Sequence, residues 1–290
     1  MTTHSLPTSA VTRSVEDLVM DSPKVDNRAP FELLTALFSD LREKIWDRLD
    51  LELDPSCSDI TPYRNLAGEV TGSVSNFTGP EVDWAVSSWM GTPESSFTNL
   101  HLTVWLGPHT RVPHLWLAVG TIPQLFVYMD YGPRADLAAD MDYLQRYYQP
   151  ENDRFMDLCE DARFVPFVSR SVEVRSFISP VGTCATSDPT PEAIAKVSEA
   201  AHAMVDRWLG WLEEPETVPE DQRQALAVRD ELVRRNIAET DPANRLAVRL
   251  LGEPLTDRLV RALWGGGRAL PRPDGATPQK KHSPTQGTEE

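Results

Sequence analysis

The first hydrophobic pattern along the chain is that of a helix. Between residues 30 and 50, apolar side chains recur every three or four positions, which predicts an amphipathic helix. Pro30 suits its first turn, where a backbone N–H is not needed. The apolar face consists of Phe31, Leu34, Leu37, Phe38, Leu41, Ile45, Trp46 and Leu49.

The pattern then changes to short segments that are rich in Val, Trp and Phe and separated by Gly and Pro. Alternation is clearest where leucine and valine face one side of a strand and His101, Thr103 and Trp105 face the other. Consecutive strands of this kind favour antiparallel pairing. We expect five strands, at 67–78, 81–90, 97–106, 114–120 and 124–130.

Helical patterns return after residue 135, with one further strand expected at 171–179, where apolar and polar residues alternate. This order predicts an α+β fold, an α/β/α sandwich whose central antiparallel sheet is flanked by helices on both faces. The expected helices lie at 136–148, 151–160, 190–213, 220–237, 243–251 and 254–264.

Composition divides the chain into a body and two ends. Residues 1–28 and 268–290 are rich in Ser, Thr, Pro or Gly and are expected to be disordered tails, which leaves 29–267 as a single catalytic domain. The 28 Lys and Arg against 44 Asp and Glu give a net charge of −16, which is unfavourable for nucleic-acid binding. Apolar runs are far shorter than the roughly 20 residues of a membrane helix. Three scattered cysteines favour a cytoplasmic protein with reduced thiols.

The sequence contains no dinucleotide, phosphate-loop, esterase or zinc-protease fingerprint. His101 and His114 lie on neighbouring predicted strands and could face each other. No carboxylate or cysteine lies at a spacing typical of a third metal ligand, so no metal is predicted. Two alternatives remain for His101. It is either a hydrogen-bonded strand residue or a proton shuttle in a cavity.

Two carboxylates are candidate acids or bases. Glu94 lies in a turn between aromatic strands, and it is either solvated or turned into an apolar pocket that raises its pKa. Asp241 precedes Pro242, and it either caps a helix or works as an acid. Tryptophans on the predicted strands form either core or a flat site for an aromatic ligand. They are Trp84, Trp89, Trp105 and Trp116.

Several motifs resemble the red chlorophyll catabolite reductases, which are relatives of the ferredoxin-dependent bilin reductases. Three blocks carry the resemblance besides Ser88-Trp89, and they span about residues 30–265 in order. The first comprises Asp130, Pro133, Arg134, Asp136, Leu137, Asp142, Tyr143, Leu144, Tyr147 and Tyr148. The second comprises Ser171, Val174, Arg175, Ser179 and Pro180, and the third Arg234, Arg235, Asp241, Gly252 and Glu253.

The resemblance implies a sandwich, often dimeric, with a ligand pocket between the sheet and the C-terminal helices. Members protonate a tetrapyrrole with carboxylates while ferredoxin delivers electrons, and no cofactor is bound. The family's C-terminal acid matches Asp241. Its strand glutamate falls on Ala118, which cannot donate a proton. Bacterial proteins similar to this fold include Pictet–Spengler cyclases of alkaloid biosynthesis.

Ala118 and the acidic charge therefore favour chemistry without electrons, and the first hypothesis is a cofactor-independent Pictet–Spengler condensation of a tryptophan-like amine with an aldehyde. Glu94 or Asp241 would remove the indole proton, with His101 as a further catalytic candidate. Two alternatives are a ferredoxin-dependent reductase of a linear tetrapyrrole and a non-catalytic protein that binds a pigment or aromatic metabolite. The expected substrate-binding residues are Arg175, Trp105, Trp116, His114 and Ser179.

Overall fold

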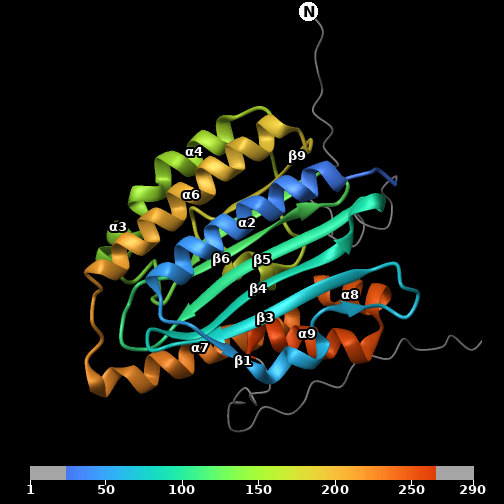
Figure 1. Cartoon of the computed structure of the whole chain (residues 1–290). Helices are drawn as coiled ribbons and strands as arrows, with labels where there is room; N and C mark the ends of the chain where they lie inside the picture. The colour runs from blue at the N-terminus through green and yellow to red at the C-terminus, as the bar shows by residue number, and fades with distance from the viewer. Residues whose placement is uncertain (1–23, 266–290) are drawn as a thin grey trace, which may run out of the picture.

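The structure is a computed structural model that describes residues 24–265. Its centre is one antiparallel sheet with the strand order β1-β3-β4-β5-β6-β7-β9-β8, in which β2 also pairs with β3 (Figure 1). The five predicted strands correspond to β3–β7, and each pairs with the next. The strands are β1 (Glu52–Asp54), β2 (Tyr63–Arg64), β3 (Thr71–Thr78), β4 (Val82–Thr92), β5 (Phe97–Leu106), β6 (His114–Thr121), β7 (Leu125–Gly132), β8 (Val165–Pro166) and β9 (Thr183–Ser187).

Helices α2 (Arg28–Arg48) and α6 (Pro191–Glu213) cover the first face of the sheet (Figure 1). The Thr190 hydroxyl caps α6 by accepting a hydrogen bond from the Ala193 backbone N–H. Trp208 is fully buried in this layer, and its Nε1 donates to the Pro113 carbonyl at 2.9 Å. Helices α3 (Met141–Tyr147) and α4 (Asn152–Glu160) extend the same layer.

Helices α7 (Glu220–Thr240), α8 (Ala243–Leu251) and α9 (Glu253–Trp264) cover the second face (Figure 1). Two side chains of the sheet fix α9 in place, because Asn76 Nδ2 and Trp84 Nε1 both donate to the Ala262 carbonyl, at 2.6 and 3.0 Å. The predicted sandwich, with helices on both faces of an antiparallel sheet, is therefore confirmed.

The strand predicted at 171–179 is wrong, because this segment forms the short helix α5 (Val172–Phe177). The Ser171 hydroxyl accepts a hydrogen bond from the Val174 backbone N–H and starts the helix. An alternating pattern over so few residues does not distinguish a strand from one helical turn and a half. The last strand of the sheet is instead β9, whose small residues gave no strand signal.

The helix predicted at 136–148 begins later than expected, at Met141. Residues Asp136–Asp140 form a turn, in which the Asp136 carboxylate accepts from the Ala138 backbone N–H. Asp140 then caps α3 by accepting from Tyr143 N at 3.0 Å. The other predicted helices agree with the structure to within about three residues at each end.

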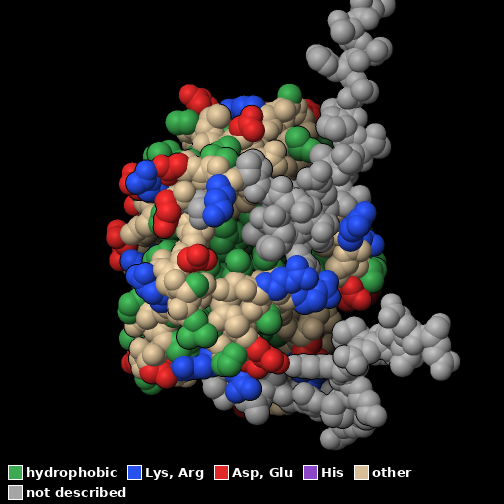
Figure 2. Space-filling model, turned by 90° about the vertical axis from the view of Figure 1, so that its right-hand side faces the viewer, with side chains coloured by type: hydrophobic (Ala, Val, Ile, Leu, Met, Phe, Trp, Pro, Cys, Tyr) green, Lys and Arg blue, Asp and Glu red, His purple; other side chains and the backbone are tan. Residues whose placement is uncertain are grey.

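Most of the two predicted tails lies outside the described residues. The end of the first, however, belongs to the domain, because Asn27 is buried and its Nδ2 donates to the carbonyls of Ser96 and Pro123. All three cysteines are free thiols. No helix within residues 24–265 combines the length and the apolar character needed to span a bilayer. Acidic and basic side chains are mixed over the face shown in Figure 2.

Candidate active site

A cavity of about 200 Å³ lies between the second face of the sheet and its helical cover. Its floor comes from β5, β6 and β7, and its cover from α5, α7 and α9. Aromatic and aliphatic side chains make up most of the wall, which is typical of a site for an apolar ligand. The predicted candidates that meet at this cavity are His101, Asp241 and Trp116.

Strand register sets a row of cavity residues across the floor. His101 pairs with Ala118, Ala118 with Tyr128, and Tyr128 with Cys184. Because paired residues in an antiparallel sheet project to the same side, all four point towards the C-terminal helices. Each is half-buried, whereas their neighbours along β5, β6 and β7 are largely buried. The position expected to carry the family's acid, Ala118, is therefore at the centre of the floor.

His101 is neutral at pH 7. Burial lowers its pKa to about 4. The Asn99 amide nitrogen, which can only donate, lies 3.1 Å from Nε2 of His101. The two side chains are therefore hydrogen-bonded to each other. A neutral imidazole is able to donate or to accept a hydrogen bond at its other ring nitrogen.

Asp241 follows α7 and faces the cavity from the side opposite the sheet. Burial raises its pKa, although the Ala243 backbone N–H, at 2.9 Å from Oδ1, acts in the other direction. The residue therefore serves two purposes. It accepts a hydrogen bond from the first residue of α8, although the N-cap position itself is Pro242, and it presents a carboxyl group whose pKa burial raises.

Trp116 lines the cavity from β6 and is almost fully buried. Its Nε1 is buried and has no hydrogen-bond partner within the described part of the chain. Trp105 packs against Trp116, with ring centroids 5.1 Å apart, but it lies in the core and does not line the cavity.

His114 is not beside His101, contrary to the sequence expectation. It starts β6, where it packs against Trp105 with ring centroids 4.6 Å apart. Its Nε2 lies 3.3 Å from Asp230, which also forms an ion pair with Arg134 at 2.7 Å. Burial alone would raise the pKa of Asp230, but His114, Arg134 and Arg229 lower it to about 2. This cluster joins β6 to α7 and lies outside the cavity.

Ser179 is buried behind the cavity, where it holds a second buried carboxylate. Its backbone N–H donates to Asp130 Oδ2 at 2.8 Å, and its hydroxyl donates to Oδ1 at 2.5 Å. The Tyr131 backbone N–H also donates to Oδ1, at 2.8 Å. Tyr128, which lines the cavity, donates to Oδ2 over a longer distance of 3.4 Å. Ser179 therefore orients Asp130 and does not itself line the cavity.

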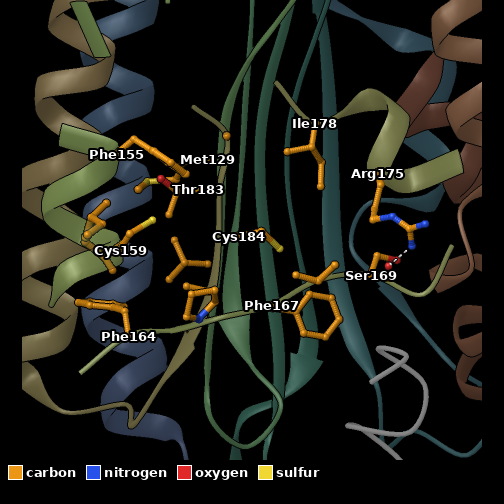
Figure 3. Close-up of a pocket in the computed structure, with 17 residues that line it drawn as sticks. Met129, Phe155, Cys159, Phe164, Phe167, Ser169, Arg175, Ile178, Thr183 and Cys184 are labelled. Carbon is orange, nitrogen blue, oxygen red and sulfur yellow. Dashed lines mark hydrogen bonds between the residues drawn. The ribbon is translucent and has the colours of Figure 1, made fainter. Parts of the chain in front are cut away.

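A second cavity of about 300 Å³ adjoins the first near β9, and Figure 3 shows it. Ser169, Ile178 and Cys184 line both cavities. Arg175 lines only the second one, and its guanidinium donates to the Ser169 carbonyl at 2.6 Å (Figure 3). The structure thus places this predicted ligand-binding arginine beside the first cavity and not in it.

Glu94 lies apart from both cavities. It is exposed in the 3-10 turn Pro93–Ser95 between β4 and β5. Tyr128 and Asp130, by contrast, were not candidates from the sequence, where Asp130 served only as a motif residue. The alternation of Phe126, Tyr128 and Asp130 along β7 was a usable signal, because it puts them on the same face as His101 once the register is known.

Comparison with known proteins agrees with this architecture. The family model for red chlorophyll catabolite reductase (RCC reductase) matches residues 34–264. The chloroplastic red chlorophyll catabolite reductase of Arabidopsis thaliana is 28% identical over 250 residues, which cover 78% of each chain. Red chlorophyll catabolite reductase 1 of Oryza sativa subsp. japonica is 27% identical over 235 residues, which cover 73% of this chain and 71% of the rice protein.

Among solved structures, selenomethionine-labelled phytochromobilin synthase from tomato in complex with biliverdin matches with a TM-score of 0.72 and 16% identity. The match covers 82% of this chain and 85% of that one, so the two share a fold. These matches support the reductase alternative better than the Pictet–Spengler hypothesis. Since the family model spans most of the chain, this protein is a member of the red chlorophyll catabolite reductase family.

Proposed function

We propose that the protein is a reductase of a linear tetrapyrrole that receives electrons from a ferredoxin-type carrier. The observation that carries the proposal is the apolar cavity under the C-terminal helices, which brings Asp241 and His101 together in a chain of this family. Reduction of one double bond consumes two electrons and two protons. The electrons come from the external carrier, and the protons must come from groups that face the cavity.

Asp241 suits the role of proton donor, since burial raises its pKa and its carboxyl faces the ligand space. The neutral His101 would donate hydrogen bonds to lactam or carboxylate oxygens of the ligand. Such bonds strengthen as charge builds on the tetrapyrrole after it accepts an electron, so they stabilise the reduced intermediate.

The first test is an anaerobic assay with reduced ferredoxin and either biliverdin or red chlorophyll catabolite. We expect the visible absorbance of the tetrapyrrole to fall and a product heavier by two hydrogen atoms to form. Omitting ferredoxin is the control. Unchanged spectra with both substrates would overturn the proposal.

Asp241→Asn tests the assigned proton donor. The amide keeps the hydrogen bond from Ala243 but has no acidic proton, so kcat is expected to fall by about 100-fold or more while ligand affinity stays similar. Rapid-mixing kinetics and fluorescence titration measure these two quantities. Asp136→Asn, in the exposed turn before α3, is the matched control. Full kcat in Asp241→Asn would remove this residue from the mechanism.

The same preparation also tests the other hypotheses. A Pictet–Spengler cyclase remains attractive because Ala118 replaces an acid, but Glu94, one of its two candidate bases, lies outside the cavity. A cyclised product from tryptamine-type amines and aldehydes, with unchanged bilin spectra, would favour it. Tight binding without turnover would favour a pigment-binding protein. A cytoplasmic location and a homodimer remain predictions, and light scattering measures the latter.

A further inference from the structure

The cavity floor lacks an acid at the position where the family resemblance implies one. Ala118 occupies it, between His101 on β5 and Tyr128 on β7. Neither neighbour is a carboxylate, yet the reduction needs two protons and Asp241 holds only one. Tyr128 is the half-buried neighbour whose hydroxyl connects the cavity with a second buried acid.

That second acid, Asp130, is firmly held. Its Oδ1 accepts from the Ser179 hydroxyl and the Tyr131 backbone N–H, so one oxygen is occupied by fixed donors. Its Oδ2 accepts from the Ser179 backbone N–H at 2.8 Å and from the Tyr128 hydroxyl at 3.4 Å. A Cβ at Gly182 would lie 2.5 Å from Oδ2, so glycine there leaves room for the carboxylate.

We propose that Tyr128 is a second catalytic acid of this enzyme and that Asp130 is the positioning residue that returns a proton to it. The inference rests on the proposed function, a two-electron reduction inside the cavity. In this proposal Tyr128 on β7 performs the proton transfer that Ala118 on β6 cannot perform.

After the ligand accepts an electron from the carrier, the Tyr128 O–H bond breaks and a C–H bond forms on the ligand. At the same time the Asp130 O–H bond breaks and its proton restores the Tyr128 hydroxyl. Asp130 is left as a carboxylate and takes a proton from solvent after product leaves. Asp241 supplies the other proton with the second electron.

Protonation of Asp130 also prepares Tyr128 for transfer. While Asp130 is ionised, the Tyr128 hydroxyl points its hydrogen at Oδ2. A proton on Oδ2 reverses that bond, so the phenol accepts it and its own hydrogen is free to turn towards the ligand. Burial raises the pKa of Asp130 to about 6, although hydrogen bonds from Ser179, Tyr131 and Tyr128 act to lower it. Asp130 can therefore take up and release a proton near neutral pH.

Other titratable groups also face this pair. Cys184 on β9 and Asp241 after α7 act on Tyr128, and His101 lies two strands away in the same row. Burial raises the pKa of the Cys184 thiol to about 12 and lowers that of His101 to about 4. Burial also raises the pKa of Asp241, but of these two carboxyl groups only Asp130 is hydrogen-bonded to Tyr128, so a pH effect near 6 that depends on Tyr128 is assigned to Asp130.

The test is Tyr128→Phe, alone and combined with Ala118→Glu. We expect kcat for bilin reduction to fall at least about 10-fold in Tyr128→Phe, with KM within about twofold. Ala118→Glu places a carboxyl group on the cavity floor, so the double variant should recover most of the lost kcat. Asp130→Asn should remove the decline of kcat that the wild type shows as pH rises through about 6.

Tyr63→Phe is the matched control. Tyr63 lies on the same side of the sheet, and its hydroxyl also makes a 3.4 Å hydrogen bond, to the Trp89 carbonyl, but it does not line the cavity. It should keep wild-type kcat. The proposal is overturned if Tyr128→Phe also keeps wild-type kcat, or if the activity that it loses is not recovered with Ala118→Glu in a folded protein that still binds the tetrapyrrole.

A wild type that reduces no tetrapyrrole would refute the proposed function, which is a different outcome. In that case infrared spectroscopy tests the pair without turnover. A protonated carboxyl band that titrates near pH 6, disappears in Asp130→Asn and shifts in Tyr128→Phe supports the coupling. A band that Tyr128→Phe leaves unchanged refutes it.

Discussion

Three aspartates, two of them buried and one half-buried, show how environment decides what one residue type does. Asp230 lies among His114, Arg134 and Arg229, which hold its pKa at about 2 despite burial, so it is a fixed structural anion. Burial raises the pKa of both Asp130 and Asp241. The difference is the presence of cationic partners. Sequence alone could not separate these roles, because two of the partners of Asp230, His114 and Arg134, lie about 100 residues away in the chain.

Asp241 and His101 were candidates from the sequence because each has a side chain suited to proton transfer and a place in a motif or an alternating strand, and both line the cavity. Glu94 was a candidate as well, but it is exposed. Whether a turn residue points inward depends on the packing of distant elements, and local pattern carries no such information. Tyr128 and Asp130 were missed for the same reason, because their partner Ser179 lies 49 residues further along the chain from Asp130.

His114 makes stability depend on pH. Burial lowers its pKa to about 4 from an ordinary 6.5, with Asp230 opposing the shift. Between these values the unfolded chain binds a proton that the folded chain does not. The free energy of unfolding is therefore highest above pH 6.5, and the contribution of His114 to it is lost as pH falls towards 4. The total loss is about 3 kcal/mol.

His114→Gln should remove this contribution. The variant is expected to be less stable at pH 7, but its loss of unfolding free energy from pH 7 to 5 should be smaller than that of wild type by about 2 kcal/mol. Urea denaturation at the two pH values measures this. His202→Gln, on α6 outside the cluster, is the control. Equal pH dependence in His114→Gln and wild type would show that folding does not lower the pKa of His114.

At the scale of elements, the long central strands, whose two faces are both buried under helices, were predictable from the sequence. The short strands at the edges of the sheet were not. The strands β3–β7 carry long alternating patterns that fix which side each residue faces. Segment 171–179 alternates as well, but it has no partner strand, and Val172 stays 61% exposed. In such a segment a local cap at Ser171 is enough to favour a helix.

Two glycines test how closely the elements pack. A Cβ at Gly132, the end of β7, would lie 2.2 Å from the Trp116 ring, which lines the cavity. Gly132→Ala should therefore displace the indole, destabilise the fold by about 1–3 kcal/mol and weaken tetrapyrrole binding. Gly210 in α6 has no atom within 4 Å of such a Cβ, so Gly210→Ala should stabilise by about 0.5–1 kcal/mol. Urea denaturation measures both, and shifts of the same sign would contradict this packing.

At the scale of the molecule, the layer order was predictable from the order of patterns along the chain, whereas the cavity was not. When a helix precedes a meander of strands and several helices follow it, the expected arrangement is a sheet with helices packed on both faces. The cavity arises because small and half-buried residues in paired positions, such as Ala118, leave space under the C-terminal helices. That space depends on which residues of neighbouring strands are paired. The hydrophobic pattern of each strand does not predict this pairing, because the loops between the strands vary in length and shape.

The net charge of −16 affects the proposed partner. Because its long-range field repels an acidic ferredoxin, encounter should become faster as salt rises from about 10 mM to 150 mM and shortens the screening length. Stopped-flow measurement of bilin reduction at limiting ferredoxin tests this, with reduced methyl viologen as the control, because this dye is a cation whose encounter should instead become slower as salt rises. A rate that falls steeply with salt would instead indicate a cationic docking patch among the mixed charges of Figure 2.

The position of α7–α9 at the end of the domain has a consequence for synthesis. Both helices that cover the first face, α2 and α6, are complete by residue 213, but the cover of the second face ends only at residue 264. Until that cover leaves the ribosome, the face that carries Trp84, Trp105 and Trp116 remains open. The surface that later lines the cavity is thus the last part of the domain to be covered, and until then it is the part most exposed to aggregation.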